Sequence, residues 1–79
     1  MKTVSILLPD TAAVKLFVNI VEQCDFDVDL VSGRYCINAK SMMGILSLGT
    51  GSTMEMEIRG TEEQAADLLG KVDMYLVKE

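Results

Sequence analysis

The chain has 79 residues and a formal net charge of −5, from twelve acidic and seven basic side chains. This length predicts a single domain covering residues 1–79. An acidic balance without any basic run argues against nucleic acid or a membrane surface as a partner. No apolar stretch approaches the roughly 18 residues of a membrane-spanning helix. Pro9 and Asp10 also end the apolar N-terminal run too early for a signal peptide, so we expect a cytoplasmic protein.

The first predicted elements are a strand over residues 3–8 and a helix over residues 11–23. Apolar side chains alternate along the strand, and those expected to face the core are Val4, Ile6 and Leu8. Pro9 ends the strand, and Asp10 and Thr11 are both suitable N-cap residues for the helix. Helical spacing gives this helix an apolar face made up of Val14, Leu16, Phe17, Val18, Ile20 and Val21.

Residues 25–31 and 34–39 predict two strands joined by a tight turn at Ser32 and Gly33. The inward positions of the first strand are Phe26, Val28 and Leu30. Its outward positions are Asp25, Asp27 and Asp29. Alternating carboxylates also occur in calcium loops, but such a loop needs Gly where Leu30 stands and Glu where Cys36 stands. We therefore interpret the three carboxylates as the solvated face of a strand.

Residues 41–48 predict a short helix with Ser41 as its N-cap and Gly49 closing it in the left-handed conformation. Residues three and four apart share a helix face, which gives two apolar stripes. The first stripe consists of Ile45 and Leu48. The second consists of Met42, Met43 and Leu46. A surface helix buries one stripe in its own core, so we expect the second to be exposed and available to a partner.

The last predicted elements are a strand over residues 53–59 and a helix that begins with a capping box at Thr61 and Gln64. This helix is expected to run to about Lys78, with an apolar face made up of Ala65, Leu68, Leu69, Val72 and Leu76. Every predicted strand has one apolar and one polar face. The pattern therefore predicts an α+β fold whose helices cover one side of a sheet.

Cys24 and Cys36 are the two cysteines, and the chain contains no His. Neither a Cys-x-x-Cys pair nor a mixed Cys and His cluster is present, so the spacing does not suggest a metal site. We expect two buried free thiols rather than a disulfide. No metal or other cofactor is expected.

The run Lys40-Ser41-Met42-Met43-Gly44-Ile45-Leu46-Ser47-Leu48-Gly49 resembles the central segment of the HPr family, the phosphocarriers of the bacterial sugar phosphotransferase system. In that family a Lys-Ser-apolar-Met-Gly-apolar-apolar-Ser-Leu-Gly run opens the second helix. Looser similarity covers nearly the whole chain without gaps. The resemblance implies an open-faced β-sandwich, βαββαβα in order, with a four-stranded antiparallel sheet and three helices on one face. Its fourth strand would lie between the first two, and the protein would not be an enzyme.

The histidine that carries the phosphoryl group in this family is missing here. Counting back from Ser41 without gaps places Asp10 at the His position and Ala12 where the family has Arg. A phosphohistidine is therefore excluded. Asp10 has two interpretations: it caps the following helix, or it accepts a phosphoryl group as an acyl phosphate. The second needs nearby cations, and the basic residue nearest in sequence is Lys15.

The resemblance also implies that Ser41 is the target of a regulatory Ser kinase, as in catabolite-repression HPr, which likewise lacks the His. We therefore expect a regulatory binding module switched by phosphorylation at Ser41. Its partner-binding residues are expected to be Lys40, Met42, Met43 and Leu46. The expected partners are phosphotransferase-system enzymes, the Ser kinase/phosphorylase and a transcriptional regulator. The alternatives are a phosphocarrier that uses Asp10, and a decoy or structural domain that is not phosphorylated.

Overall fold

A four-stranded antiparallel sheet in the order β1-β4-β2-β3 forms one layer of the protein. The computed structural model describes residues 1–77. The strands are β1 (Lys2–Leu7), β2 (Asp27–Ser32), β3 (Tyr35–Asn38) and β4 (Thr53–Arg59). At the centre of the sheet, Met56 of β4 lies opposite Val4 on one side and Leu30 on the other. The fourth strand thus lies between the first two, as the resemblance implied.

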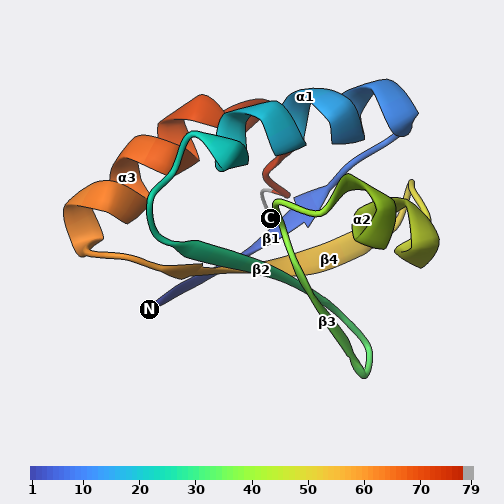
Figure 1. Ribbon diagram of the computed structural model, residues 1–79, viewed down its shortest axis with the longest axis horizontal. Coiled ribbons are helices and arrows are strands. Elements are labelled where there is room, and N and C mark those ends of the chain that lie inside the picture. Colours follow the sequence, from blue (N-terminus) through green and yellow to red (C-terminus); the bar gives the residue numbers. More distant parts are fainter. Residues whose placement is uncertain (78–79) are drawn as a thin grey trace.

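Three α-helices form the second layer of the described residues. They are α1 (Thr11–Glu22), α2 (Met42–Leu48) and α3 (Glu62–Lys71). Figure 1 shows α1 and α3 lying across one face of the sheet, while the opposite face is left open. The short helix α2 contacts both α1 and β3. These findings confirm the predicted α+β open-faced architecture. Within residues 1–77, the helices are too short or too polar to cross a membrane.

The core lies between the two layers, where the apolar faces of helices and strands meet. Its largest fully buried side chains include Phe17, Ile6, Leu8, Leu30, Ile45, Met56, Ile58 and Leu68. Burial of a side chain of this size contributes about 1.5–3 kcal/mol. The predicted inward positions are confirmed as fully buried for Ile6, Leu8, Val28 and Leu30, while Val4 and Phe26 are half-buried and pack against the core.

The C-terminal segment differs from the prediction of one helix running to about Lys78. Helix α3 ends at Lys71, and a 3-10 turn (Asp73–Tyr75) follows it. The ring of Tyr75 then packs edge-to-face on Phe17, with 6.2 Å between the centroids. Leu76 forms a bridge with Ile6 of β1, and the Val77 N–H donates to the carbonyl of Ser5 at 2.9 Å. A continued helix could not cover this edge of the sheet, and Lys78 lies outside the described residues.

Two predictions of burial are also wrong. Leu16 was assigned to the apolar face of α1, but its side chain is 57% exposed. It follows the buried Val14 by two positions, about half a helical turn, so it points the other way. Both cysteines are free, as expected, but Cys36 is exposed and Cys24 is half-buried. Cys36 occupies an outward position of the edge strand β3, next to the half-buried Ile37.

Candidate functional site

Asp10, the residue at the family's His position, caps helix α1. Its backbone is extended, and its carboxylate accepts a hydrogen bond from the Ala13 N–H at 2.9 Å. The side chain lies at the surface. Within residues 1–77, the ion pairs involve the carboxylates of Asp29, Glu57 and Asp67 rather than that of Asp10. The predicted cap is therefore confirmed, and among the described residues Asp10 has no ion pair of the kind that would offset the charge of an acyl phosphate.

Ser41 caps helix α2 in the same way. Its hydroxyl accepts a hydrogen bond from the Gly44 N–H at 3.2 Å, and its carbonyl accepts from the Ile45 N–H at 3.1 Å. The residue is exposed. At the other end of the helix, Gly49 has φ +94° but ψ 165°, so it is not in the left-handed helical conformation that we predicted. The Ser41 hydroxyl thus lies at the surface of a short, well-capped helix.

Helix α2 buries a different set of side chains from the one predicted. Ile45 is fully buried, while Met43 is 83% and Leu46 is 38% exposed, as expected. Met42 was predicted to be exposed, but it is half-buried and packs against the core. It precedes Ile45 by three positions, so both lie on one face with the half-buried Leu48. The exposed apolar surface of α2 therefore consists of Met43 and Leu46.

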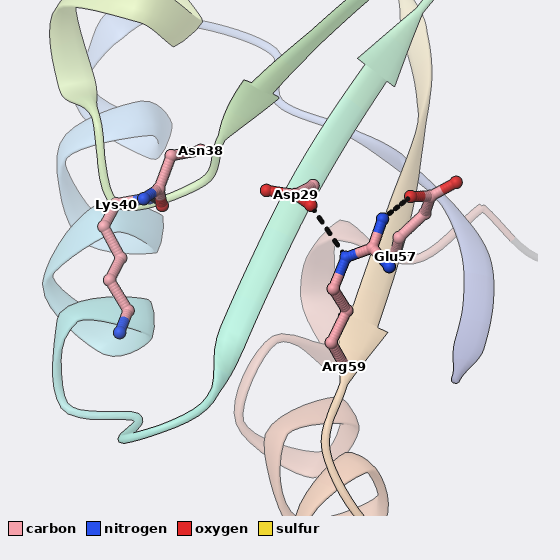
Figure 2. Close-up of polar contacts among 5 residues, drawn as sticks. All are labelled: Asp29, Asn38, Lys40, Glu57 and Arg59. Carbon is pink, nitrogen blue, oxygen red and sulfur yellow. Dashed lines mark hydrogen bonds and ion pairs between the residues drawn. The ribbon is translucent and has the colours of Figure 1, made fainter.

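Lys40 has a structural contact that the sequence did not indicate. Its ammonium nitrogen donates to the carbonyl oxygen of Cys24 at 2.8 Å, just beyond the end of α1. Its backbone N–H donates to the side-chain oxygen of Asn38, also at 2.8 Å. Figure 2 shows the Lys40 side chain extending away from the ion pairs formed by Arg59. The ammonium group of Lys40 thus donates one hydrogen bond within the protein, and its role in partner binding stays a prediction.

The open face of the sheet carries an ion-pair cluster that sequence analysis missed. Arg59 donates through Nε to Asp29 and through a terminal nitrogen to Glu57, both at 2.9 Å (Figure 2). The hydrogen bond to Asp29 raises the pKa of the Arg59 guanidinium. Asp29 and Glu57 lie directly opposite each other on adjacent strands, where two like charges repel. Arg59 offsets that repulsion.

The same cluster contains three potential metal ligands. One donor atom each from Asp29, Cys36 and Glu57 lie within 4.8 Å of one another. Both carboxylates already bind Arg59, so we interpret the group as a cross-strand ion-pair cluster. Its members are up to 30 positions apart in the chain, and only the strand register brings them together.

Known proteins share both the sequence pattern and the fold. The family model described as "PTS HPr component phosphorylation site" matches residues 10–77. Phosphocarrier protein HPr from Bacillus anthracis str. Ames is 31% identical, with a TM-score of 0.67 over 96% of this chain and 94% of that one. HPr-C-His from Thermoanaerobacter tengcongensis is 29% identical, with a TM-score of 0.74 over 91% and 90%.

A third solved structure supports the fold alone. The histidine-containing phosphocarrier protein of Mycoplasma is 15% identical, with a TM-score of 0.72 over 99% of this chain and 100% of that one. No curated protein matches the chain. Because the family model covers most of the sequence and an HPr protein is 31% identical over nearly the whole chain, the chain belongs to the HPr family of the bacterial phosphotransferase system.

Proposed function

We propose that this chain is a cytoplasmic regulatory binding module of the phosphotransferase system, switched by phosphorylation of Ser41. The observation that carries this proposal is the contrast between two helix caps. The chain has no His, and Asp10 at that position is engaged as a cap and forms no ion pair with a described residue. Ser41, in contrast, is exposed within a run that matches the family pattern. The chain therefore has the hydroxyl group that regulation at Ser41 requires, but it lacks the His that phosphohistidine transfer requires.

A phosphate on Ser41 would change the charge of its surroundings sharply. Between Leu30 and Met54 the charged residues are Arg34 and Lys40, both basic. Phosphorylation adds about −1.5 to −2 charge at neutral pH. The modification would thus introduce the first negative group into this stretch. Free N–H groups at the start of α2 favour an anion there, so we expect the backbone to tolerate it.

The exposed apolar surface of α2 lies close to Ser41, so a phosphate on Ser41 would affect which partners bind to this surface. Met43 and Leu46 extend into solvent within five positions of Ser41. Exposed methionine adapts to differently shaped partner surfaces. An adjacent phosphate would repel an acidic partner and recruit one that bears Arg or Lys. The partners that we propose are phosphotransferase-system enzymes, the Ser kinase/phosphorylase and a transcriptional regulator.

A kinase assay tests the proposal. The wild-type protein is incubated with ATP and the HPr Ser kinase of a Gram-positive bacterium, and its intact mass is measured. We expect the addition of one phosphate to the wild type and none to Ser41→Ala. Ser47→Ala is the matched control, because Ser47 is an exposed hydroxyl in the same helix, and it should be modified like the wild type. An unmodified wild type would leave Ser41 as a helix cap and contradict the proposal.

A further inference from the structure

Helix α2 contains a glycine that its backbone conformation does not require. Gly44 is the third of the seven residues of the helix. The glycines with positive φ are Gly33, Gly49 and Gly51, so Gly44 has a conformation open to any residue. Glycine in the body of a helix is less favourable than alanine. A helix this short would gain from a side chain at position 44, so we looked for a steric reason for its absence.

The surroundings of Gly44 supply that reason. A Cβ atom at this position would lie 3.0 Å from the hydroxyl oxygen of Ser41 and 3.5 Å from Cδ1 of Ile37. A carbon and an oxygen at 3.0 Å are closer than ordinary van der Waals contact. A free hydroxyl can rotate or shift slightly to relieve this contact. A phosphoryl group on the same oxygen has three further oxygens and much less freedom to do so.

The N-cap of α3 shows the opposite arrangement within the same protein. Thr61 caps that helix and accepts a hydrogen bond from the Gln64 N–H at 3.1 Å. The Gln64 side chain reaches back and accepts from the Thr61 N–H at 2.9 Å. A side chain therefore lies beside the cap at α3, whereas Gly44 leaves the equivalent position at α2 empty. Both cap residues are extended, with φ −97° and ψ 100° at Ser41 and φ −72° and ψ 166° at Thr61, and they differ in whether a side chain lies beside the hydroxyl.

We propose that Gly44 keeps the space beside the Ser41 hydroxyl open for a phosphoryl group, and so determines whether Ser41 can be modified. This inference rests on the proposed function. In the step concerned, Ser41 Oγ forms a bond to the γ-phosphorus of ATP. The bond from that phosphorus to the bridging oxygen breaks, ADP leaves and the hydroxyl proton passes to the kinase. A side chain at position 44 would crowd both the attacking oxygen and the phosphoserine that is formed.

The decisive variant is Gly44→Gln, which places beside the Ser41 hydroxyl a side chain like the one that Gln64 places beside Thr61, although the Ser41 N–H already donates to the Asn38 carbonyl at 3.0 Å. We expect a melting temperature at or above that of the wild type, because the variant replaces a glycine within a helix by a better helix former. We also expect the initial rate of Ser41 phosphorylation by the Ser kinase to fall at least about tenfold. If Gly44 had only a structural role, the variant would not lower the phosphorylation rate while its melting temperature was maintained. A rate within about twofold of the wild type would overturn the inference.

Gly70→Ala is the matched control, since a Cβ at Gly70 in α3 would meet no atom within 4 Å. It should raise the melting temperature by about 4–8 °C and leave the phosphorylation rate unchanged. Gly44→Ala, which is smaller, is used if Gly44→Gln does not fold, with the same expected direction.

A second measurement needs no kinase and separates this inference from the proposed function. Chains synthesised with phosphoserine or serine at position 41 are compared by thermal melting, in the wild type and in Gly44→Ala. We expect phosphoserine to lower the melting temperature by about 4 °C more in the Gly44→Ala background. An equal effect in both backgrounds would overturn the role of Gly44, even if the kinase modifies Ser41. If the kinase does not modify the wild type, the proposed function fails and this comparison still decides the steric claim.

Discussion

The ammonium group of Lys40 lies 2.8 Å from the carbonyl oxygen of Cys24, which links the end of α1 to the residue before the Ser41 cap. Cys24 follows the last turn of α1, and its N–H donates to the Val21 carbonyl at 2.9 Å. A positive charge at this end of a helix is favourable because the unpaired carbonyls carry partial negative charge. Lys40 therefore fixes the start of α2 relative to α1.

Replacement of Lys40 by Met should remove this hydrogen bond while the apolar stem of the side chain is kept. We expect the free energy of unfolding to fall by about 1–2 kcal/mol, since the lost bond is charge-assisted and half-buried. Lys15→Met is the control, because Lys15 is exposed on α1, and it should change stability by less than about 0.5 kcal/mol. Urea unfolding measures both. Equal, small effects would show that the Lys40 contact does not contribute to stability.

Substitutions at Asp10 separate its role as a cap from its negative charge. Asp10→Ala loses the hydrogen bond to the Ala13 N–H and should cost about 1 kcal/mol. Asp10→Asn keeps a cap of similar strength and should stay within about 0.5 kcal/mol of the wild type. Thermal unfolding of the wild type and the two variants gives the order of their stabilities. A destabilised Asp10→Asn would mean that the charge itself matters at this position.

Charged substitutions on α2 test which methionine belongs to the exposed surface. Met43→Glu should change stability by less than about 1 kcal/mol, because the side chain is 83% exposed. Met42→Glu should cost more, at least about 2 kcal/mol, because Met42 packs against the core and a carboxylate there loses hydration. Denaturant unfolding compares the pair. A larger loss for Met43→Glu would place Met43 in the core and remove the basis for a partner surface.

Burial raises the pKa of the Cys24 thiol above its ordinary value, against the opposing effect of Lys71 and Lys40. The folded state then holds the thiol proton to higher pH than the unfolded state does. The resulting stability is fully present below the unfolded pKa of about 8.5 and is lost as the pH rises through the folded pKa. In a Cys36→Ser background, the alkylation rate of Cys24 should therefore rise at higher pH in the folded protein than in urea. The prediction is contradicted if the alkylation rate of the folded protein has its pH midpoint at or below the midpoint measured in urea.

Local signals in the sequence were sufficient for most of the fold. Alternation along residues 53–59 predicted β4 with its observed bounds, and the capping box at Thr61 and Gln64 was found as predicted. Such features depend on residues a few positions apart. The end of α3 was misplaced because the pairing of Leu76 with Ile6 joins opposite ends of the chain.

The candidate site was predictable only in its helix caps. Asp10 and Ser41 are recognisable because a cap and its N–H donor lie three positions apart. The predicted exposure of Met42 was wrong. A residue three positions before Ile45 can belong to either apolar stripe of so short a helix, and helical spacing alone did not show which one it joins. The contacts of Lys40 with Cys24 and of Arg59 with Asp29 join distant segments, and no local pattern could reveal them.

A comparison of two phosphoryl donors tests the proposed switch at Ser41 most directly. The protein is incubated either with phosphoenolpyruvate and the first enzyme of the phosphotransferase system, or with ATP and the Ser kinase, and both samples are read by intact mass. We expect no phosphate from the first donor and one from the second, absent from Ser41→Ala. The contradicting result is a hydroxylamine-labile phosphate from phosphoenolpyruvate that persists in Ser41→Ala and disappears in Asp10→Asn.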